Sequence, residues 1–219
     1  FAPSSNLDLK LGLFYTKTTD VPRYDRLIRY RGDNLRSAEW YYGPQKWLMA
    51  NFGLDYRNSN NSFFDNAKAT AAYQKFNESR NDRDFDDIIL SSREEQVDAL
   101  SFNLDLEKIF NSNLSLFYGI EYVHNTISSE GFQTNIETLE RESIVTRYPD
   151  GSTWQSAAAY FNLKYKPTQT FTLQSGLRYN MISLKSNFEE NNEFLNLPSN
   201  EANNTFDAVT GSLGFSWLP

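Results

Sequence analysis

Apolar and polar residues alternate along the chain in about eight separate segments, most plainly between Val209 and Trp217. The apolar positions of that segment are Val209, Gly211, Leu213, Phe215 and Trp217, and the small polar or glycine positions between them are Thr210, Ser212, Gly214 and Ser216. Successive side chains of a strand point to opposite faces, so the alternation predicts strands with one apolar and one polar face. The segments are long enough to cross a bilayer as tilted strands. The pattern therefore predicts an all-β fold, a transmembrane antiparallel up-and-down β-barrel with its apolar face toward lipid.

The seven other predicted strands show the same alternation. They occupy the ranges 7–16, 48–56, 67–74, 100–107, 114–122, 157–165 and 171–180. The range 67–74 has the weakest signal, because its alanines would also suit a short helix. We assign it as a strand because it lies between two clear turn or loop segments.

The connections between these strands alternate between long and short. The long ones are 17–43, 77–96, 127–154 and 183–205, and the short ones are 58–62, 111–113 and 166–168. In an up-and-down sheet this order places every long loop at one end and every tight turn at the other, as in bacterial outer-membrane barrels. Soluble sandwiches and lipocalin-type barrels seldom have four loops of roughly 20 residues or more.

Aromatic residues cluster at the ends of the predicted strands. They are Tyr15, Tyr56, Phe110, Tyr122, Tyr165, Phe171, Tyr179 and Trp217. In a membrane barrel they would form girdles at the two lipid interfaces. The alternative is that strands simply favour aromatic residues.

Composition narrows the classes of protein that fit. The chain has 219 residues, 16% of them aromatic, yet its mean hydropathy is only -0.62, which suits two-faced strands joined by charged loops. No apolar run is long enough for a membrane helix. With no cysteine and His124 as the only histidine, a structural zinc site is implausible. A net charge of -7 argues against a nucleic-acid partner.

The chain offers little catalytic chemistry, and we expect no enzymatic activity, cofactor or bound metal. No nucleophile elbow, phosphate-binding glycine loop or HExxH pair occurs. His124 could serve as a base in a lipase-like barrel, but no nucleophile motif lies near it. The acidic cluster of Asp82, Asp84, Asp86 and Asp87 invites a calcium interpretation, but it lacks the glycine and spaced glutamate of a calcium loop, and neighbouring arginines favour a solvated loop tip.

Six stretches carry a resemblance to a known family. They are DVPRYDRL (20–27), AEWYYGPQKWLM (38–49), SRNDRDFDD (79–87), TRYPDGSTW (146–154), TLQSGLRY (172–179) and TGSLGFSWLP (210–219). In these, and across almost its whole length, the chain resembles the barrel region of TonB-dependent outer-membrane receptors. Similar sequence stretches recur in that group, and they identify no ligand.

The resemblance implies a barrel of 22 strands in the outer membrane of a Gram-negative bacterium, plugged by an N-terminal domain and energised by TonB for uptake of a scarce nutrient such as a ferric siderophore or another metal chelate. The implied partners are outer-membrane lipid, the plug domain of the same receptor and TonB. A surface lipoprotein is a further candidate partner. Because the chain holds only about eight strands and no plug or TonB box, we expect residues 1–219 to be a partial barrel domain. The start FAPSSN carries no secretory signal, and Leu218 and Pro219 resemble the start of another turn.

Two groups of residues are candidates for functional contacts. Trp40, Tyr41 and Tyr42, with Arg36 close by, have chemistry suited to catecholate, haem or phosphate-bearing ligands, although they could equally serve packing between loops. Charged residues on the predicted lumen face could hydrogen-bond to a plug, or only hydrate the wall. These are Asp8, Lys10, Asp55, Lys68, Asp105, Glu107, Glu121, Lys164 and Arg178.

Two other functional classes fit parts of the pattern. A passive porin or small outer-membrane barrel would have to close on itself within these residues. A soluble β-sandwich adhesin or sugar-binding module would bury the apolar face in a core. A flanking plug domain would separate a receptor from a porin, and heat-modifiable migration on a gel would separate membrane barrels from the sandwich.

Overall fold

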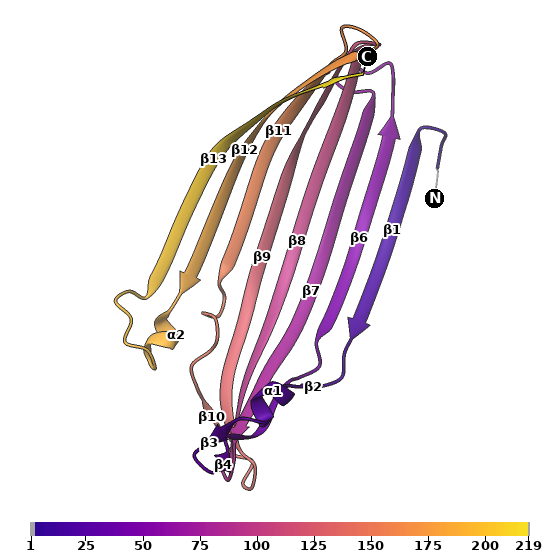
Figure 1. Cartoon of the computed structure of the whole chain (residues 1–219). Coiled ribbons are helices and arrows are strands. Elements are labelled where there is room, and N and C mark those ends of the chain that lie inside the picture. The colour runs from indigo at the N-terminus through magenta and orange to yellow at the C-terminus, as the bar shows by residue number, and fades with distance from the viewer. Residues whose placement is uncertain (1–2, 219) are drawn as a thin grey trace.

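The chain folds as one large antiparallel sheet (Figure 1), seen in a computed structural model that describes residues 3–218. Eight long strands lie side by side in the order β1, β6, β7, β8, β9, β11, β12 and β13. Their bounds are β1 Leu7–Lys17, β6 Lys46–Arg57, β7 Asn66–Asp84, β8 Ile89–Asn111, β9 Leu114–Asn135, β11 Thr153–Tyr165, β12 Phe171–Asn187 and β13 Glu201–Trp217. The eight predicted strands and the up-and-down order are therefore confirmed.

Short elements fill the connections at one end of the sheet. They are β2 Val21–Pro22, α1 Tyr24–Leu27, β3 Tyr30–Arg31, β4 Asn34–Leu35, β5 Ser37–Tyr42, β10 Arg141–Ser143 and α2 Glu189–Asn192. In Figure 1 the tight turns lie at the upper end, and α1, β3, β4 and β10 lie at the lower end. In the described part of the chain, no helix is long and apolar enough to cross a membrane.

The apolar positions of all eight strands fall on one face of the sheet, and that face is exposed. Leu11 is 85% exposed and Leu213 is 77% exposed, although both belong to the most regular apolar segments. Among residues 3–218 the only buried hydrophobic residue is Ala158, with 7% exposure. A soluble sandwich would bury this face in a core, so the sandwich alternative does not fit. We call the apolar face the outer face and the opposite one the inner face.

The apolar residues of the outer face form a belt that runs obliquely across the strands. At the long-loop end its last member in each strand is followed by a polar or charged outer residue; these members are Tyr15, Leu48, Tyr73, Leu100, Tyr122, Ala157, Met181 and Val209. Following the strand register from Val209 leads across the sheet to Leu9, six residues before Tyr15. Six residues span about 20 Å and seven strand spacings about 34 Å, so the strands tilt by roughly 30° away from the perpendicular to the belt.

This tilt gives the belt the height of a membrane core. Nine residues, such as Leu7 to Tyr15, cover about 26 Å along a strand, or roughly 23 Å perpendicular to the belt. Outer-membrane barrels carry an apolar band about 25 Å tall. The predicted aromatic girdle residues lie at both edges of the belt, with Tyr15 at one edge and Trp217 at the other, both well exposed.

The predicted boundaries at the long-loop end were wrong, because the strands continue beyond the belt. Most of 77–96 belongs to β7 and β8, and only residues 85–88 connect them. β9 likewise runs nine residues into the predicted connection 127–154, and the connection 183–205 lies partly in β12 and β13. A strand outside lipid needs only a paired neighbour, so it can be polar on both faces and leave no alternation in the sequence.

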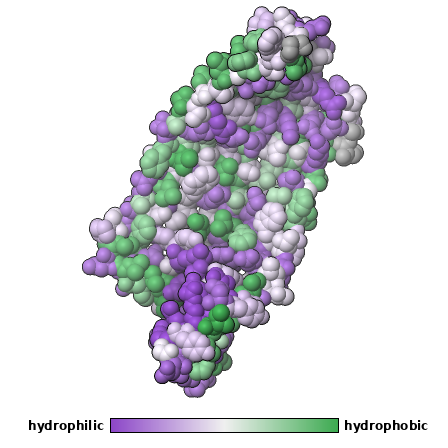
Figure 2. Space-filling model, in the orientation of Figure 1, coloured by the Kyte–Doolittle hydropathy of each residue, from purple (hydrophilic) through white to green (hydrophobic). Residues whose placement is uncertain are grey.

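The two edges of the sheet are β1 and β13, which do not pair with each other in the described residues. The sheet is therefore an open wall and not a closed small barrel. In Figure 2 hydrophilic residues gather toward the lower end of the face in view, where α1 and the ends of β7 to β9 lie in Figure 1. The expectation about Leu218 and Pro219 falls partly on residue 219, and the expectation about FAPSSN partly on residues 1 and 2, outside the described residues.

Candidate functional site

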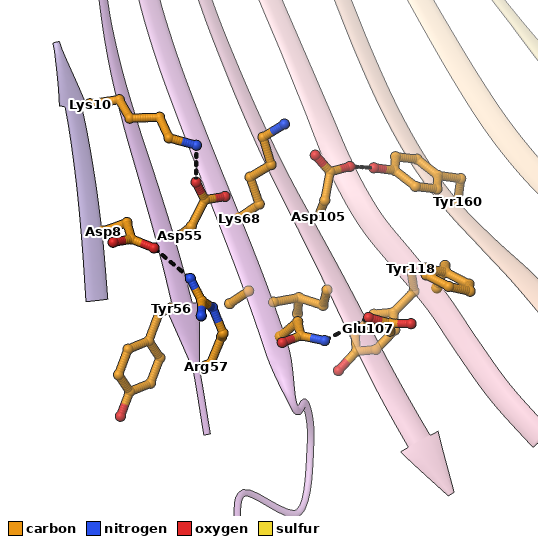
Figure 3. Close-up of a pocket in the computed structure, with 14 residues that line it drawn as sticks. Asp8, Lys10, Asp55, Tyr56, Arg57, Lys68, Asp105, Glu107, Tyr118 and Tyr160 are labelled. Atoms are coloured by element: carbon orange, nitrogen blue, oxygen red, sulfur yellow. Dashed lines mark hydrogen bonds and ion pairs between the residues drawn. The ribbon is translucent and has the colours of Figure 1, made fainter. Parts of the chain in front are cut away.

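The inner face carries a network of charged and polar side chains near the tight-turn end (Figure 3). The Lys10 ammonium donates to Asp55 at 2.6 Å, and the Arg57 guanidinium donates to Asp8 at 2.5 Å. These pairs join β1 to β6, and Lys68 of β7 lies beside Asp55 in the same row. Strand alternation places them here, because every second residue faces away from the belt.

Glycine and alanine let two contacts reach across an intervening strand. Tyr160 of β11 donates a hydrogen bond to Asp105 of β8, although β9 lies between them. Gly119 occupies the row between the two, and a Cβ there would meet the Leu104 carbonyl oxygen at 2.3 Å and the Tyr160 hydroxyl at 2.6 Å. The bare backbone at this position is therefore what allows the Tyr160 ring to cross β9.

Arg178 and Glu121 form the second such contact. Arg178 of β12 pairs with Glu121 of β9 over β11, where the small Ala158 lies directly opposite Glu121. The guanidinium carbon of Arg178 also lies 5.5 Å from the centre of the Tyr160 ring. Charges at this depth would be costly in hydrocarbon but are acceptable on a face that meets water or polar protein.

The structure brings eight of the nine predicted lumen residues into this network or beside it. Glu107 accepts from Asn66 at 2.6 Å, and a shallow cavity of about 440 Å³ runs along the row from Asp8 to Tyr160. Lys164 lies apart, near the turn after β11. The sequence analysis missed Arg57 and Tyr160, although Arg57 is simply the next inner position after Asp55.

A second cluster lies on the inner face at the long-loop end, where arginines surround two aromatic rings. The guanidinium carbons of Arg23, Arg26 and Arg80 lie 5.1, 5.8 and 5.4 Å from the centre of the Trp40 ring. Trp40 and Tyr42 meet edge to face, with ring centres 5.2 Å apart. We call these five residues the arginine–aromatic cluster.

Strand β5 explains which of the predicted ligand residues join this cluster. The segment was predicted as an irregular loop, but β5 pairs with β7, and Trp40 and Tyr42 lie opposite Asp82 and Arg80. Alternation turns Tyr41 to the other face, where burial raises the pKa of its hydroxyl. Arg36 precedes β5 and lies outside the cluster.

The charges of this cluster are only partly balanced. Arg23 donates two hydrogen bonds to Asp25, which hold the pKa of that carboxyl below its usual range. Among the described residues the buried Nε–H groups of Arg26 and Arg80 have no hydrogen-bond partner, although Arg26 Nε lies 3.8 Å from Asp25 Oδ2. Burial raises the pKa of the nearby Asp82 carboxyl, which weakens its ability to neutralise the guanidinium groups. The cluster can therefore attract an anion with an aromatic or planar surface.

The connection 144–152 covers the inner face beside this cluster. A Cβ at Gly131 would meet the carbonyl oxygens of Ile144 and Val145 at 2.6 and 2.8 Å, so the connection lies directly on β9. Beneath it Glu95 is only 5% exposed, and neither carboxyl oxygen accepts a hydrogen bond from any residue between 3 and 218. Arg147 of the connection comes within 3.9 Å of Glu95 and pairs with Glu78 at 2.7 Å.

The remaining candidates of the sequence take structural positions. His124 lies on the outer face just beyond the belt, within hydrogen-bond distance of Thr126. Asp84 pairs with Arg31 at 3.0 Å, and Asp86 takes a positive φ of 61° in the turn between β7 and β8. Within residues 3–218 no group of three or more histidine, cysteine, aspartate or glutamate side chains has the geometry to hold a metal ion.

Comparison with known proteins relates this wall to larger membrane proteins. Among solved structures, the chain superposes on the copper transporter OprC with a TM-score of 0.66 and 12% identity, covering 80% of this chain and 28% of that one. It also superposes on the siderophore receptor PiuA from Acinetobacter baumannii, with a TM-score of 0.61, 14% identity and coverage of 100% and 38%. For the ferric yersiniabactin uptake receptor FyuA from Yersinia pestis the values are 0.60, 12%, 97% and 33%.

These likenesses show a shared fold, and the chain spans about 28% to 38% of the length of these three structures. No curated protein matches the sequence. The family model described as "TonB dependent receptor-like, beta-barrel" matches residues 2–219. The chain therefore belongs to the family of TonB-dependent receptor β-barrels.

Proposed function

We propose that residues 1–219 form part of the wall of an outer-membrane receptor that takes up an anionic metal chelate, such as a ferric siderophore. Barrels of this family reside in the outer membrane of Gram-negative bacteria, and TonB-dependent receptors contain a plug domain and interact with TonB. The membrane location is supported by the exposed apolar belt and its height. In this proposal the partial barrel is completed by further strands and a plug, and uptake draws its energy from TonB.

The arginine–aromatic cluster is the observation that carries the ligand class. It lies on the inner face at the long-loop end, where a ligand arriving from outside first meets the barrel. Three guanidinium groups around Trp40 favour negative charge, and the rings of Trp40 and Tyr42 offer surfaces for a planar ligand. The solved neighbour named as a siderophore receptor supports the same class, and the neighbour named as a copper transporter supports uptake of a metal.

The network near the tight-turn end suits a different partner, the plug domain. Its members carry charges of both signs from β1 to β12, and several are already paired, so a polar protein surface could replace the water on this face while keeping the charges hydrogen-bonded. Lys68 forms no ion pair with another of the described residues and is the member best placed to bind a plug carboxylate or carbonyl.

A binding titration tests the ligand class. In the intact receptor, tryptophan fluorescence should respond to a ferric tris-catecholate, and Arg80→Gln should weaken that binding by roughly tenfold, because it removes a charged donor from a desolvated site. Arg31→Gln is the matched control, since Arg31 pairs with Asp84 and not with the rings. We expect the control to bind like wild type and a neutral ferric hydroxamate to bind more weakly.

Two results would contradict the proposal. One is equal binding by wild type and Arg80→Gln. The other is uptake of the labelled chelate that continues undiminished in cells without TonB, which would favour passive diffusion through a pore.

A further inference from the structure

Three lysines lie together on the outer face, immediately beyond the belt at the long-loop end. Lys17 of β1 and Lys46 of β6 are direct cross-strand partners. Lys75 of β7 lies diagonal to Lys46, because its direct partner is Leu48. All three follow apolar outer residues of their own strands, so their ammonium groups share one side of the sheet.

Among the described residues none of the three lysines forms an ion pair, and Lys75 alone faces an acid directly across the sheet, Asp98, which attracts it. The Asp98 carboxylate already accepts hydrogen bonds from Tyr73 and Gln96. Like charges directly opposite one another destabilise a sheet, so the pair of Lys17 and Lys46 calls for an anion from outside the wall.

A groove borders Lys46 and Lys75 on the side away from the belt, and the rest of its lining is acidic or neutral. It has a volume of about 430 Å³ and is lined by Lys46 and Lys75 on the side nearer the belt. Glu78, Glu94, Glu95 and Glu130 also line it, and Glu94 and Glu130 are direct cross-strand partners on the outer face. In strand register Glu94 and Glu130 lie one outer row beyond Lys46, about 7 Å along the strand. Because the belt runs obliquely, they lie still farther from its edge than this offset. Moving outward from the membrane, the wall therefore presents hydrocarbon, then cations, then carboxylates.

We propose that this lysine cluster binds the phosphate of a lipid headgroup in the leaflet that faces the long loops. A lysine at the edge of an apolar belt lies at the depth where acyl chains give way to headgroups, and clustered cations at that depth attract anionic lipids. The site is continuous with the belt, so one lipid can place its phosphate on the lysines and its acyl chains on Leu13 and Ala50. The inference rests on the membrane location in the proposed function and not on the ligand that is taken up.

Native mass spectrometry of the intact receptor in detergent tests this site. The probes are diphosphorylated lipid A, the same lipid after removal of both phosphates, and inorganic phosphate. Wild type should retain the phosphorylated lipid, and the double variant Lys17→Gln/Lys46→Gln should bind it roughly 10- to 30-fold more weakly, since each lysine near a membrane surface contributes modestly to binding. Lys17→Arg/Lys46→Arg keeps both charges and should bind like wild type.

Glu94→Gln is the matched control, because it changes one charge in the same groove without touching the lysines. Equal retention of phosphorylated and dephosphorylated lipid would overturn the proposal. Loss of binding in Lys17→Arg/Lys46→Arg would overturn it too, and so would binding like wild type by Lys17→Gln/Lys46→Gln. Inorganic phosphate that competes as strongly as the lipid would also overturn it, by showing a free-anion site. Folding of each variant is checked by heat-modifiable migration on a gel. A folded receptor that binds no phosphorylated lipid rejects this site alone, whereas failure to bind a chelate rejects only the proposed function.

Discussion

At the scale of single residues, Leu213 and Ser212 share depth and backbone but face opposite sides of β13. Leu213→Arg places a charge against hydrocarbon and should lower the free energy of unfolding of the intact receptor by about 2 to 4 kcal/mol. Ser212→Arg should cost much less, because the inner face keeps a guanidinium hydrated. Leu213→Phe should be tolerated, since lipid accommodates volume that a close-packed core does not. Urea midpoints in lipid or detergent measure all three, and a larger loss from Ser212→Arg than from Leu213→Arg would reverse the assignment of the faces.

The buried carboxyl of Glu95, outside the membrane belt, makes the stability of the connection 144–152 depend on pH. Burial raises the pKa of this carboxyl, and nearby Arg147 opposes this rise without cancelling it. A raised pKa means that the protonated carboxyl favours the folded state. The packing of the connection 144–152 over Glu95 is therefore most stable below the ordinary glutamate pKa, and it loses stability as the pH rises through the raised value. At neutral pH, Glu95→Gln should slow hydrogen exchange of the Ile144 and Gly151 amides a few-fold relative to wild type. Unchanged hydrogen exchange in that variant, compared at the same pH, would show that the ionised Glu95 carboxylate does not destabilise the packing of 144–152 on β9.

At the scale of elements, the extension of β7 and β8 beyond the belt fixes which turns face the outside. Residues 1–219 contain no cysteine, so an introduced cysteine is the only one in this wall, and the receptor without it gives the background labelling. On intact cells, a membrane-impermeant maleimide should label Asp86→Cys in the turn between β7 and β8. It should reach Ser112→Cys, in the tight turn before β9, only after the outer membrane is disrupted. Labelling of Ser112→Cys alone on intact cells would invert the orientation.

The same extension shows where sequence reasoning works and where it stops. Leu100 to Leu106 alternate because lipid meets one face, and that requirement made β8 predictable within the belt. From Ile89 to Glu95 both faces of β8 meet water or protein, so backbone pairing with β7 and β9 holds the strand without any sequence period. For the same reason β5 could not be predicted, and without β5 nothing separated Tyr41 from Trp40 and Tyr42.

At the scale of the whole molecule, the open edges β1 and β13 decide what this chain can do alone. Their outward backbone groups would be unpaired in lipid, where each lacks a hydrogen-bonding solvent. We expect residues 1–219, reconstituted alone in planar bilayers, to give no stable discrete conductance. Steady single-channel steps would instead favour a small closed barrel. The order of the eight strands was predictable from alternation and loop lengths, but the tilt of the wall required the register of every pair.

The near absence of buried apolar side chains has a consequence for biogenesis. A soluble domain stabilises itself by removing hydrocarbon from water, but among the described residues of this wall only Ala158 is a buried hydrophobic residue. In water the polypeptide has no interior to collapse into, and its belt would be as exposed after folding as before. Bilayer lipid must supply that interior, so folding and insertion are one event. Before it reaches the membrane, the newly made chain must stay unfolded, and a carrier that shields Leu11, Leu213 and their neighbours from one another would keep it from aggregating.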